Sequence, residues 1–137
     1  MAQYLGDKSA LARVHHDDVM LRVSALYLSG QIATCGMIDL EMLYSARNGD
    51  DHRELVYDRL LLPRVPCGDD VFDRAIDVQG TLAETGRHRG VALEDLIIAA
   101  AAEQAGLAVL HYDQDYDLIA EITGQPTEWV VPRGTVP

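Results

Sequence analysis

The sequence has 137 residues, 48% of them hydrophobic, which suits one domain over residues 1–137 and is too hydrophobic for a disordered chain. Its 22 acidic and 11 basic residues give a net charge of −11, which disfavours long-range attraction to nucleic acid unless metal ions or local arginines compensate. No apolar run approaches the roughly 20 residues of a membrane span, and residues 1–7 do not resemble the start of a secretory signal. We therefore expect a cytoplasmic protein that does not contact membranes, with Cys35 and Cys67 as buried thiols.

Glycine and proline residues divide the chain into short segments that alternate between strand and helix patterns. In chain order we expect a strand over residues 3–6, helices over 8–14 and 17–29, a strand over 31–35, helices over 37–47 and 51–62, an extended piece over 64–66, helices over 69–86 and 93–105, a strand over 107–112, a helix over 116–123 and a last strand over 127–131. Asn48 and Gly49 are expected to end the helix that precedes them. The alternation predicts a three-layer α/β/α sandwich with a mostly parallel central sheet.

Two acidic residues directly follow predicted strands. Ligands bind beyond the carboxyl ends of the strands in parallel sheets, and Asp7 and Asp113 are expected at this edge. For each residue taken alone, capping of the next helix explains the position as well as a functional role does.

Two further acids are expected near the beginnings of buried helices. Glu41 lies among hydrophobic neighbours after the second strand, where Asp39 is the better candidate for complementing the helix dipole. Asp95 lies in the first turn of a helix that has no polar residue from 96 to 102, so this helix should be buried. A buried carboxylate needs a cation or hydrogen-bond donors, although either Glu94 or Asp95 could be purely structural.

Taken together, these four acids predict a metal site. Clustered carboxylates repel one another, whereas one or two Mg²⁺ or Mn²⁺ ions would cancel their charge and prefer oxygen ligands. Such ions can activate water and stabilise the leaving oxygen in phosphodiester cleavage. The acidic composition is then compatible with a nucleic-acid substrate, because metal rather than a basic surface would meet the phosphate.

Four segments, in the same order along the chain, resemble the VapC-type toxins of the PIN-domain ribonuclease family. Residues 7–11 (Asp-Lys-Ser-Ala-Leu) resemble the family's opening Asp-Thr-Ser-Ala-Leu, and Glu41 falls where the family has a helical Glu. Residues 95–100 (Asp-Leu-Ile-Ile-Ala-Ala) resemble its Asp-Ala-Leu-Ile-Ala-Ala, and residues 112–116 (Tyr-Asp-Gln-Asp-Tyr) resemble its Thr-x-Asp-x-Asp-Phe. Lys8 replaces the commoner Thr or Ser, so no hydroxyl role carries over to that position.

The resemblance implies the endoribonuclease toxin of a type II toxin–antitoxin pair, acting on RNA with Mg²⁺ or Mn²⁺. It also implies a homodimer and inhibition by a small antitoxin that binds DNA. The implied metal ligands and catalytic residues are Asp7, Glu41, Asp95 and Asp113. Asp115 is a further metal or water-positioning candidate, and Ser9 is expected either to hydrogen-bond at the site or to cap a helix.

Several other interpretations fit less well. Residues 113–117 resemble the start of an EF-hand loop, but Leu118 stands where that loop needs Gly and Gly124 where it needs Glu. The pair His15 and His16 has no second histidine cluster to complete a metal site, and Arg87 to Arg89 could contact RNA or form a solvated loop. The alternative function is a non-catalytic PIN-like scaffold that binds a protein partner. Its expected sign is the loss of site acids, and all four are present.

Overall fold

Four parallel strands form the centre of the computed structural model, which describes all residues from Met1 to Pro137. The strands are β1 (Tyr4–Gly6), β2 (Ile32–Ala33), β3 (Ala108–His111) and β4 (Thr127–Trp129), in the spatial order β2-β1-β3-β4. The central strand β1 pairs through Leu5 with Ala33 on one side and Val109 on the other. The prediction of a mostly parallel sheet is confirmed, and every strand pair is parallel.

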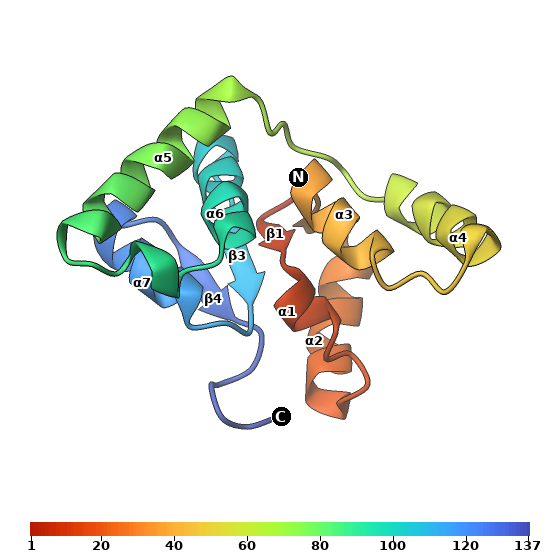
Figure 1. Ribbon diagram of the computed structural model, residues 1–137. Helices are drawn as coiled ribbons and strands as arrows, with labels where there is room; N and C mark the ends of the chain where they lie inside the picture. Colours follow the sequence, from red (N-terminus) through yellow and green to blue (C-terminus); the bar gives the residue numbers. More distant parts are fainter.

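Helices cover both faces of the sheet (Figure 1). They are α1 (Lys8–Leu11), α2 (Asp17–Leu28), α3 (Gly36–Leu43), α4 (Gly49–Leu60), α5 (Asp69–Glu84), α6 (Leu93–Ala105) and α7 (Asp115–Thr123), with a 3-10 turn η1 (His88–Gly90) before α6. In Figure 1, α5, α6 and α7 lie to the left of the sheet, α1 and α2 lie to its right, and α4 extends away from the rest. This is the three-layer sandwich that the sequence predicts.

The alternation of side chains along the strands divides the buried residues into two cores. Leu5, Ala33 and Val109 point to the larger core, which they share with α3, α5, α6 and α7. Their neighbours Ile32 and Leu110 point to the smaller core beneath α1 and α2. β1, β2 and β3 are buried and mostly apolar, as covered parallel strands require, whereas β4 at the edge carries the exposed Glu128. None of the helices is long and apolar enough to span a membrane.

Several predicted boundaries are wrong. Asn48 does not end α3 but caps the start of α4, where its side chain accepts a hydrogen bond from the Asp51 amide at 2.9 Å. The first helix ends at Leu11 rather than at residue 14. Phe72 and Ile76, which share the apolar face of α5 with the buried Val71 and Ala75, are 46% and 62% exposed. The periodicity of a helix defines its apolar face, but neighbouring elements decide how much of that face they cover.

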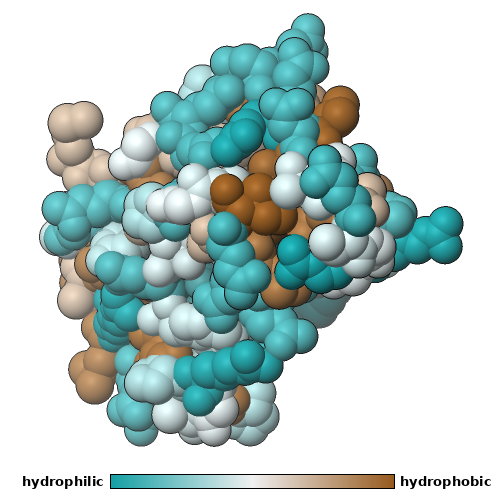
Figure 2. Space-filling view, turned by 90° about the vertical axis from the view of Figure 1, so that its left-hand side faces the viewer, coloured by the Kyte–Doolittle hydropathy of each residue, from teal (hydrophilic) through white to brown (hydrophobic).

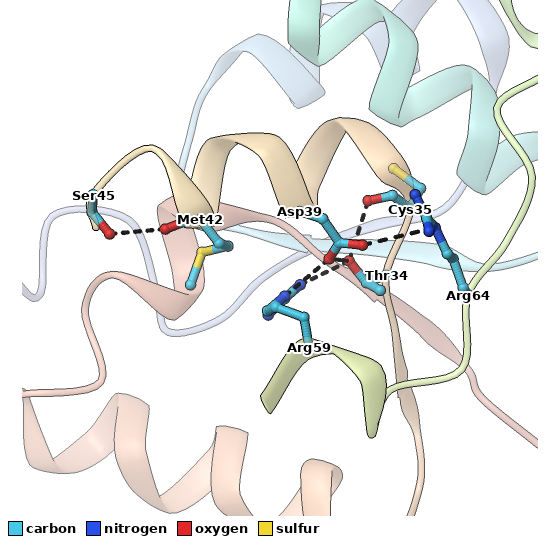
Figure 3. A network of polar contacts seen from close by, with 7 residues as sticks. All are labelled: Thr34, Cys35, Asp39, Met42, Ser45, Arg59 and Arg64. Carbon is cyan, nitrogen blue, oxygen red and sulfur yellow. Dashed lines mark hydrogen bonds and ion pairs between the residues drawn. The ribbon is translucent and has the colours of Figure 1, made fainter. Parts of the chain in front are cut away.

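A polar network, rather than a core, holds α4 in place, since this helix has no buried residue. The Asp39 carboxylate of α3 accepts hydrogen bonds from the Thr34 hydroxyl at 2.8 Å and from Arg59 Nε of α4 at 2.9 Å (Figure 3). Arg59 also donates to the Thr34 hydroxyl at 2.7 Å, and Arg64 Nε lies 3.8 Å from the same carboxylate. Asp39 is therefore a structural partner of α4.

The segment after α4 extends the sheet beyond β2. Thr34 forms a parallel bridge with Arg64, and its amide donates to the Pro63 carbonyl at 2.8 Å. The predicted extended piece over residues 64–66 therefore covers an edge that β2 would otherwise leave open.

The surface on the α5 and α7 side is mostly hydrophilic. A compact hydrophobic patch lies near its centre, surrounded by hydrophilic atoms (Figure 2). Of the 22 acidic residues, only Asp7 and Asp95 are buried.

Candidate active site

The carboxyl ends of β1 and β3 bring the predicted acids to one edge of the sheet. The two strands are neighbours and parallel, so Asp7, which follows β1, and Asp113, which follows β3, emerge at the same edge. The amide of Asp7 donates to the Leu110 carbonyl at 2.9 Å, which continues the pairing of the strands. The N-terminal turns of α6 and α7 carry Asp95 and Asp115 to this edge.

Asp7 is almost fully buried and accepts hydrogen bonds on both carboxylate oxygens. As the N-cap of α1, its Oδ2 accepts from the Ser9 amide at 3.0 Å and from the Ser9 hydroxyl at 2.5 Å. Oδ1 lies 2.7 Å from the hydroxyl of Tyr116, a fully buried residue of α7. The Ser9 oxygen in turn accepts from the Tyr112 amide at 2.8 Å. Ser9 therefore hydrogen-bonds at the site and joins the ends of β1 and β3, whereas the cap of α1 is Asp7 rather than Ser9.

Three carboxylates form the densest part of the cluster. One oxygen from each of Asp95, Asp113 and Asp115 lies within 4.8 Å of the other two. Asp113 accepts a hydrogen bond from the Asp115 amide at 2.9 Å, and Asp115 accepts one from the Ala92 amide at 3.1 Å. The second bond fixes the start of α6 and hence the position of Asp95.

Burial raises the pKa of Asp95 to about 10, reinforced by a hydrogen bond with Asp115 and by the negative charges of Asp7 and Asp113. Without a cation, this carboxyl therefore holds a proton at neutral pH. Its Oδ1 is 3.1 Å from the Tyr116 hydroxyl. A hydroxyl has one proton, so Tyr116 can donate fully to only one of the two carboxyl groups, and its shorter contact, 2.7 Å, is to Asp7.

Glu41 approaches the cluster from α3 and has a carboxylate oxygen without a partner. Its Oε1 is buried and accepts no hydrogen bond. Burial, followed by the charges of Asp7 and Glu94, raises the pKa of Glu41 to about 7, against a smaller opposing effect of Lys8. A pocket of about 320 Å³ gives access to this carboxylate, and its lining includes Lys8, Tyr44 and Glu94.

These residues fit a site for hard divalent cations. All donors are oxygens, the preferred ligands of Mg²⁺ and Mn²⁺. The buried Glu41 oxygen without a partner and the strongly raised pKa of Asp95 are what such a cluster shows when no cation offsets its charge. Asp7 is linked to Asp95 through the Tyr116 hydroxyl, and Glu41 is close enough to Asp7 and Asp113 for their charges to raise its pKa.

Histidines take no part in the cluster. His111 is fully buried, its ring lies 4.9 Å from the Tyr116 ring and 5.0 Å from the Trp129 ring, and burial lowers its pKa. Its Nδ1 accepts from the Asp113 amide at 3.1 Å, which helps to orient the loop after β3. Asp117, expected at the start of a helix, lies in the first turn of α7 and accepts from Trp129 Nε1 at 3.2 Å.

Sequence reasoning missed two residues of this region. The phenolic hydroxyl of Tyr116 links Asp7 to Asp95, and nothing in the local sequence pattern indicates which residue α7 would direct inward. Glu94, considered only as a structural alternative to Asp95, lines the pocket beside Glu41.

Comparison with known proteins agrees with this arrangement. Residues 4–122 match the PIN domain family. The chain is 49% identical over 134 residues to the protein named Ribonuclease VapC21 from Mycobacterium tuberculosis, with 97% of each chain covered. It is 46% identical over 132 residues to Ribonuclease VapC18 from the same organism, which covers 95% of this chain and 96% of the relative.

Solved structures show the same fold. DNA-bound VapBC from Salmonella typhimurium contains a chain that superposes with a TM-score of 0.75 at 15% identity, covering 96% of this chain and all of that one. VapBC2 from Rickettsia felis bound to a promoter fragment gives a TM-score of 0.72 at 15% identity, covering 92% and 98%. With the family match over most of the chain and close relatives over almost its whole length, this chain belongs to the VapC ribonucleases of the PIN-domain family.

Proposed function

We propose that this chain is an endoribonuclease toxin that depends on Mg²⁺ or Mn²⁺ and cleaves RNA phosphodiester bonds in the cytoplasm at the acidic edge of the sheet. The observation that carries the proposal is the gathering of five acidic side chains, with one buried carboxylate oxygen unpartnered, in a chain 49% identical to a named ribonuclease. Asp7, Glu41, Asp95 and Asp113 would hold one or two ions, with Asp115 as a further ligand. A bound divalent ion would supply activation of water and stabilisation of the leaving oxygen.

The chain's own residues fix the geometry of this site. Ser9 and Tyr116 hold both oxygens of Asp7, so this carboxylate is oriented before any ligand arrives. Asp115 accepts a hydrogen bond from the Ala92 amide and so fixes the start of α6, which determines where Asp95 lies in the site. Glu41 places an unpartnered oxygen opposite them from α3. Preorganised groups of this kind keep the cost of reorganisation low when charge develops in the reaction.

The same electrostatics support an antitoxin partner. The solved relatives include a toxin–antitoxin complex from Klebsiella pneumoniae, similar in fold at a TM-score of 0.71 and 16% identity. We propose that a cognate antitoxin inserts a basic segment, with arginine as the residue that can engage two carboxylates at once. Homodimerisation is proposed on the family resemblance, with exposed apolar residues such as Leu40 and Tyr44 available for contacts.

Metal-dependent cleavage of RNA by the purified protein tests the proposed function. We expect cleavage with Mg²⁺ or Mn²⁺, none in excess EDTA, and a loss of at least about a hundredfold in Asp95→Asn. Arg53→Gln is the control, because Arg53 lies on the exposed face of α4 and pairs only with Asp50. Full activity in EDTA would contradict the metal mechanism. Absence of activity under all conditions, together with tight binding of an antitoxin, would favour the non-catalytic scaffold.

A further inference from the structure

The positive charges that remain free of acidic partners are concentrated beside the acidic cluster. Seven of the ten arginines form an ion pair with an Asp or Glu side chain. The three that do not are Arg13, Arg89 and Arg133, and two of these, Arg13 and Arg133, line the same pocket. In a chain with net charge −11, two arginines that line one pocket and form no ion pair with an Asp or Glu side chain are a local concentration of positive charge.

This pocket opens directly onto the proposed active site. It has a volume of about 390 Å³, and Asp113 forms part of its wall together with Tyr112 and Trp129. The two arginines come from opposite ends of the chain, Arg13 from the turn after α1 and Arg133 from the turn after β4. A ligand that fills the pocket would therefore contact both arginines and lie next to the acidic cluster.

Aromatic rings hold both guanidinium groups in place. The Arg13 guanidinium carbon lies 4.6 Å from the centre of the Tyr112 ring, and that of Arg133 lies 5.7 Å from the centre of the Trp129 ring. Cations stacked in this way lose less freedom when they bind an anion. The two rings therefore help to orient the guanidinium groups towards the pocket that all four residues line.

Both arginines have N–H groups that make no hydrogen bond within the protein. Arg13 donates to the main-chain oxygens of Ser9 at 2.6 Å and Pro137 at 3.0 Å. Arg133 donates to the Gln114 side-chain oxygen at 2.6 Å. A guanidinium group has five N–H donors, so each arginine retains at least three for an anionic ligand.

The turn that carries Arg133 is fixed to the body of the protein. The Tyr112 hydroxyl donates to the Val136 carbonyl at 2.7 Å and accepts from the Gly134 amide at 2.9 Å. The same Tyr112 ring lies under Arg13, so one residue positions both sides of the pocket. Because Tyr112 directly precedes Asp113, the pocket and the acidic cluster are built on the same loop.

We propose that Arg13 and Arg133 form a phosphate clamp that holds the RNA strand beside the bond to be cleaved. This inference rests on the proposed ribonuclease function and adds to it the path of the substrate across the protein. The clamp contacts the sugar-phosphate backbone, so it contributes affinity and position without selecting the base sequence. The clamp would also offset the repulsion between this acidic protein and RNA phosphates, because it places fixed positive charge next to the carboxylates.

RNA binding to the cleavage-deficient Asp95→Asn protein, with Mg²⁺ present, tests the clamp. Arg13→Gln and Arg133→Gln should each weaken the binding of a labelled single-stranded RNA by about fivefold or more. Each should also reduce the slope of log affinity against log salt by about 0.7, the value for one phosphate contact on a single strand. The effect should be equal for RNAs of different base composition.

Two further variants make the test specific. Arg53→Gln on α4 removes the same charge far from the pocket and should leave both affinity and salt slope near those of the parent. Arg133→Lys keeps the positive charge and should preserve most of the salt slope. Because this variant leaves Arg13 in place, it tests the clamp even where loss of Arg13 disturbs the packing around Tyr112. Thermal melts of each variant establish that the fold is retained.

The outcomes separate this inference from the proposed function. If the wild-type protein cleaves RNA but both arginine variants bind RNA as Arg53→Gln does, the clamp is wrong and the ribonuclease stands. If the wild-type protein shows no metal-dependent cleavage, the proposed function itself fails. If the variants lose affinity for a cognate antitoxin but not for RNA, the pocket is a protein contact and the inference is overturned.

Discussion

Asp7 and Asp95 show how the environment of a buried carboxylate decides its charge. Their exposed fractions are similar, 3% and 5%. Asp7 accepts hydrogen bonds from Ser9 and Tyr116, which replace the water that it loses. Asp95 lies among other carboxylates and has only the shared Tyr116 hydroxyl, so burial and like charge favour its neutral form. At nearly equal burial, Asp7 is oriented by two hydrogen-bond donors, whereas the pKa of Asp95 is strongly raised.

We predict that Asp95→Asn leaves the stability of the metal-free protein unchanged or slightly higher at pH 7. Because the pKa of Asp95 is raised to about 10, the amide replaces a neutral carboxyl of almost the same shape. Thermal unfolding in EDTA measures this. Asp39→Asn is the matched control, since Asp39 is paired with Arg59 and its neutralisation should cost roughly 1–3 kcal/mol. Equal destabilisation by the two substitutions would mean that Asp95 is a charged structural partner.

The raised pKa of Glu41 predicts that the stability of the metal-free protein depends on pH. Its pKa is 4.5 in the unfolded reference and about 7 when folded, so the folded form keeps the proton longer. The contribution of Glu41 to the free energy of unfolding is fully present below about pH 4.5, decreases as the pH rises towards about 7, and is lost above that value. Glu41→Gln should remove this decrease, gaining roughly 1–2 kcal/mol over wild type across the window after allowance for solvent screening.

Urea unfolding at several pH values in EDTA measures the Glu41 effect. Glu84→Gln, at an exposed position of α5, provides a comparison that should follow the wild type. If the difference in the free energy of unfolding between Glu41→Gln and wild type is constant from pH 4.5 to pH 8, Glu41 does not titrate in this window.

At the scale of elements, the helices are held in two different ways. α6 packs six buried apolar residues into the larger core, which fixes the start of the helix and how deeply Asp95 is buried. α4 buries no residue and depends on the Arg59 contacts to Asp39 and Thr34. Core packing cannot explain the exposed side chains of Tyr57 and Leu60 on α4, so this helix is the more available of the two for a partner.

We predict that Arg59→Gln destabilises the protein by about 2 kcal/mol and loosens α4 selectively. Removing one member of a largely buried pair leaves Asp39 and Thr34 without their donor. Urea unfolding measures the loss, and amide hydrogen exchange should show faster exchange in α4 than in α6. Arg53→Gln, an exposed pair on the same helix, should cost no more than about 0.5 kcal/mol. Equal effects of the two substitutions would contradict an anchoring role for Arg59.

At the scale of the whole molecule, acidic charge is concentrated where the parallel strands end. The net charge of −11 does not by itself require a metal, because only Asp7 and Asp95 of the 22 acidic residues are buried and the others have contact with solvent. The cluster around Asp95 differs because three carboxyl groups lie close together there and one of them, Asp95, is buried. A divalent cation relieves this repulsion only in the folded state, where the ligands converge.

We predict that Mg²⁺ or Mn²⁺ stabilises the folded protein by mass action. At an ion concentration ten times the Kd, the free energy of unfolding should rise by about 1.4 kcal/mol. Thermal unfolding as a function of metal concentration measures the gain, with NaCl at the same ionic strength as the control for general screening. Asp95→Asn should lose most of the specific gain. An identical response to NaCl and to Mg²⁺ would contradict a divalent-ion site.

The sequence by itself determined the class of fold and the edge at which the acids gather. Alternating strand and helix patterns predict parallel strands, and parallel strands carry the residues that follow them to a common edge. Asp7 and Asp113 could therefore be placed together from local pattern alone, and the order of the acidic segments indicated the family. Their roles as metal ligands stay a proposal.

Only the tertiary structure decided which side chains meet across that edge. Tyr116 joins Asp7 to Asp95, and Arg13 and Arg133 share a pocket although they lie at opposite ends of the chain. It also decided that Phe72 stays exposed. Periodicity reports the face of one element, which is a local property. Contacts between elements depend on how helices pack on the sheet, and this emerges only when the whole chain buries its apolar surface together.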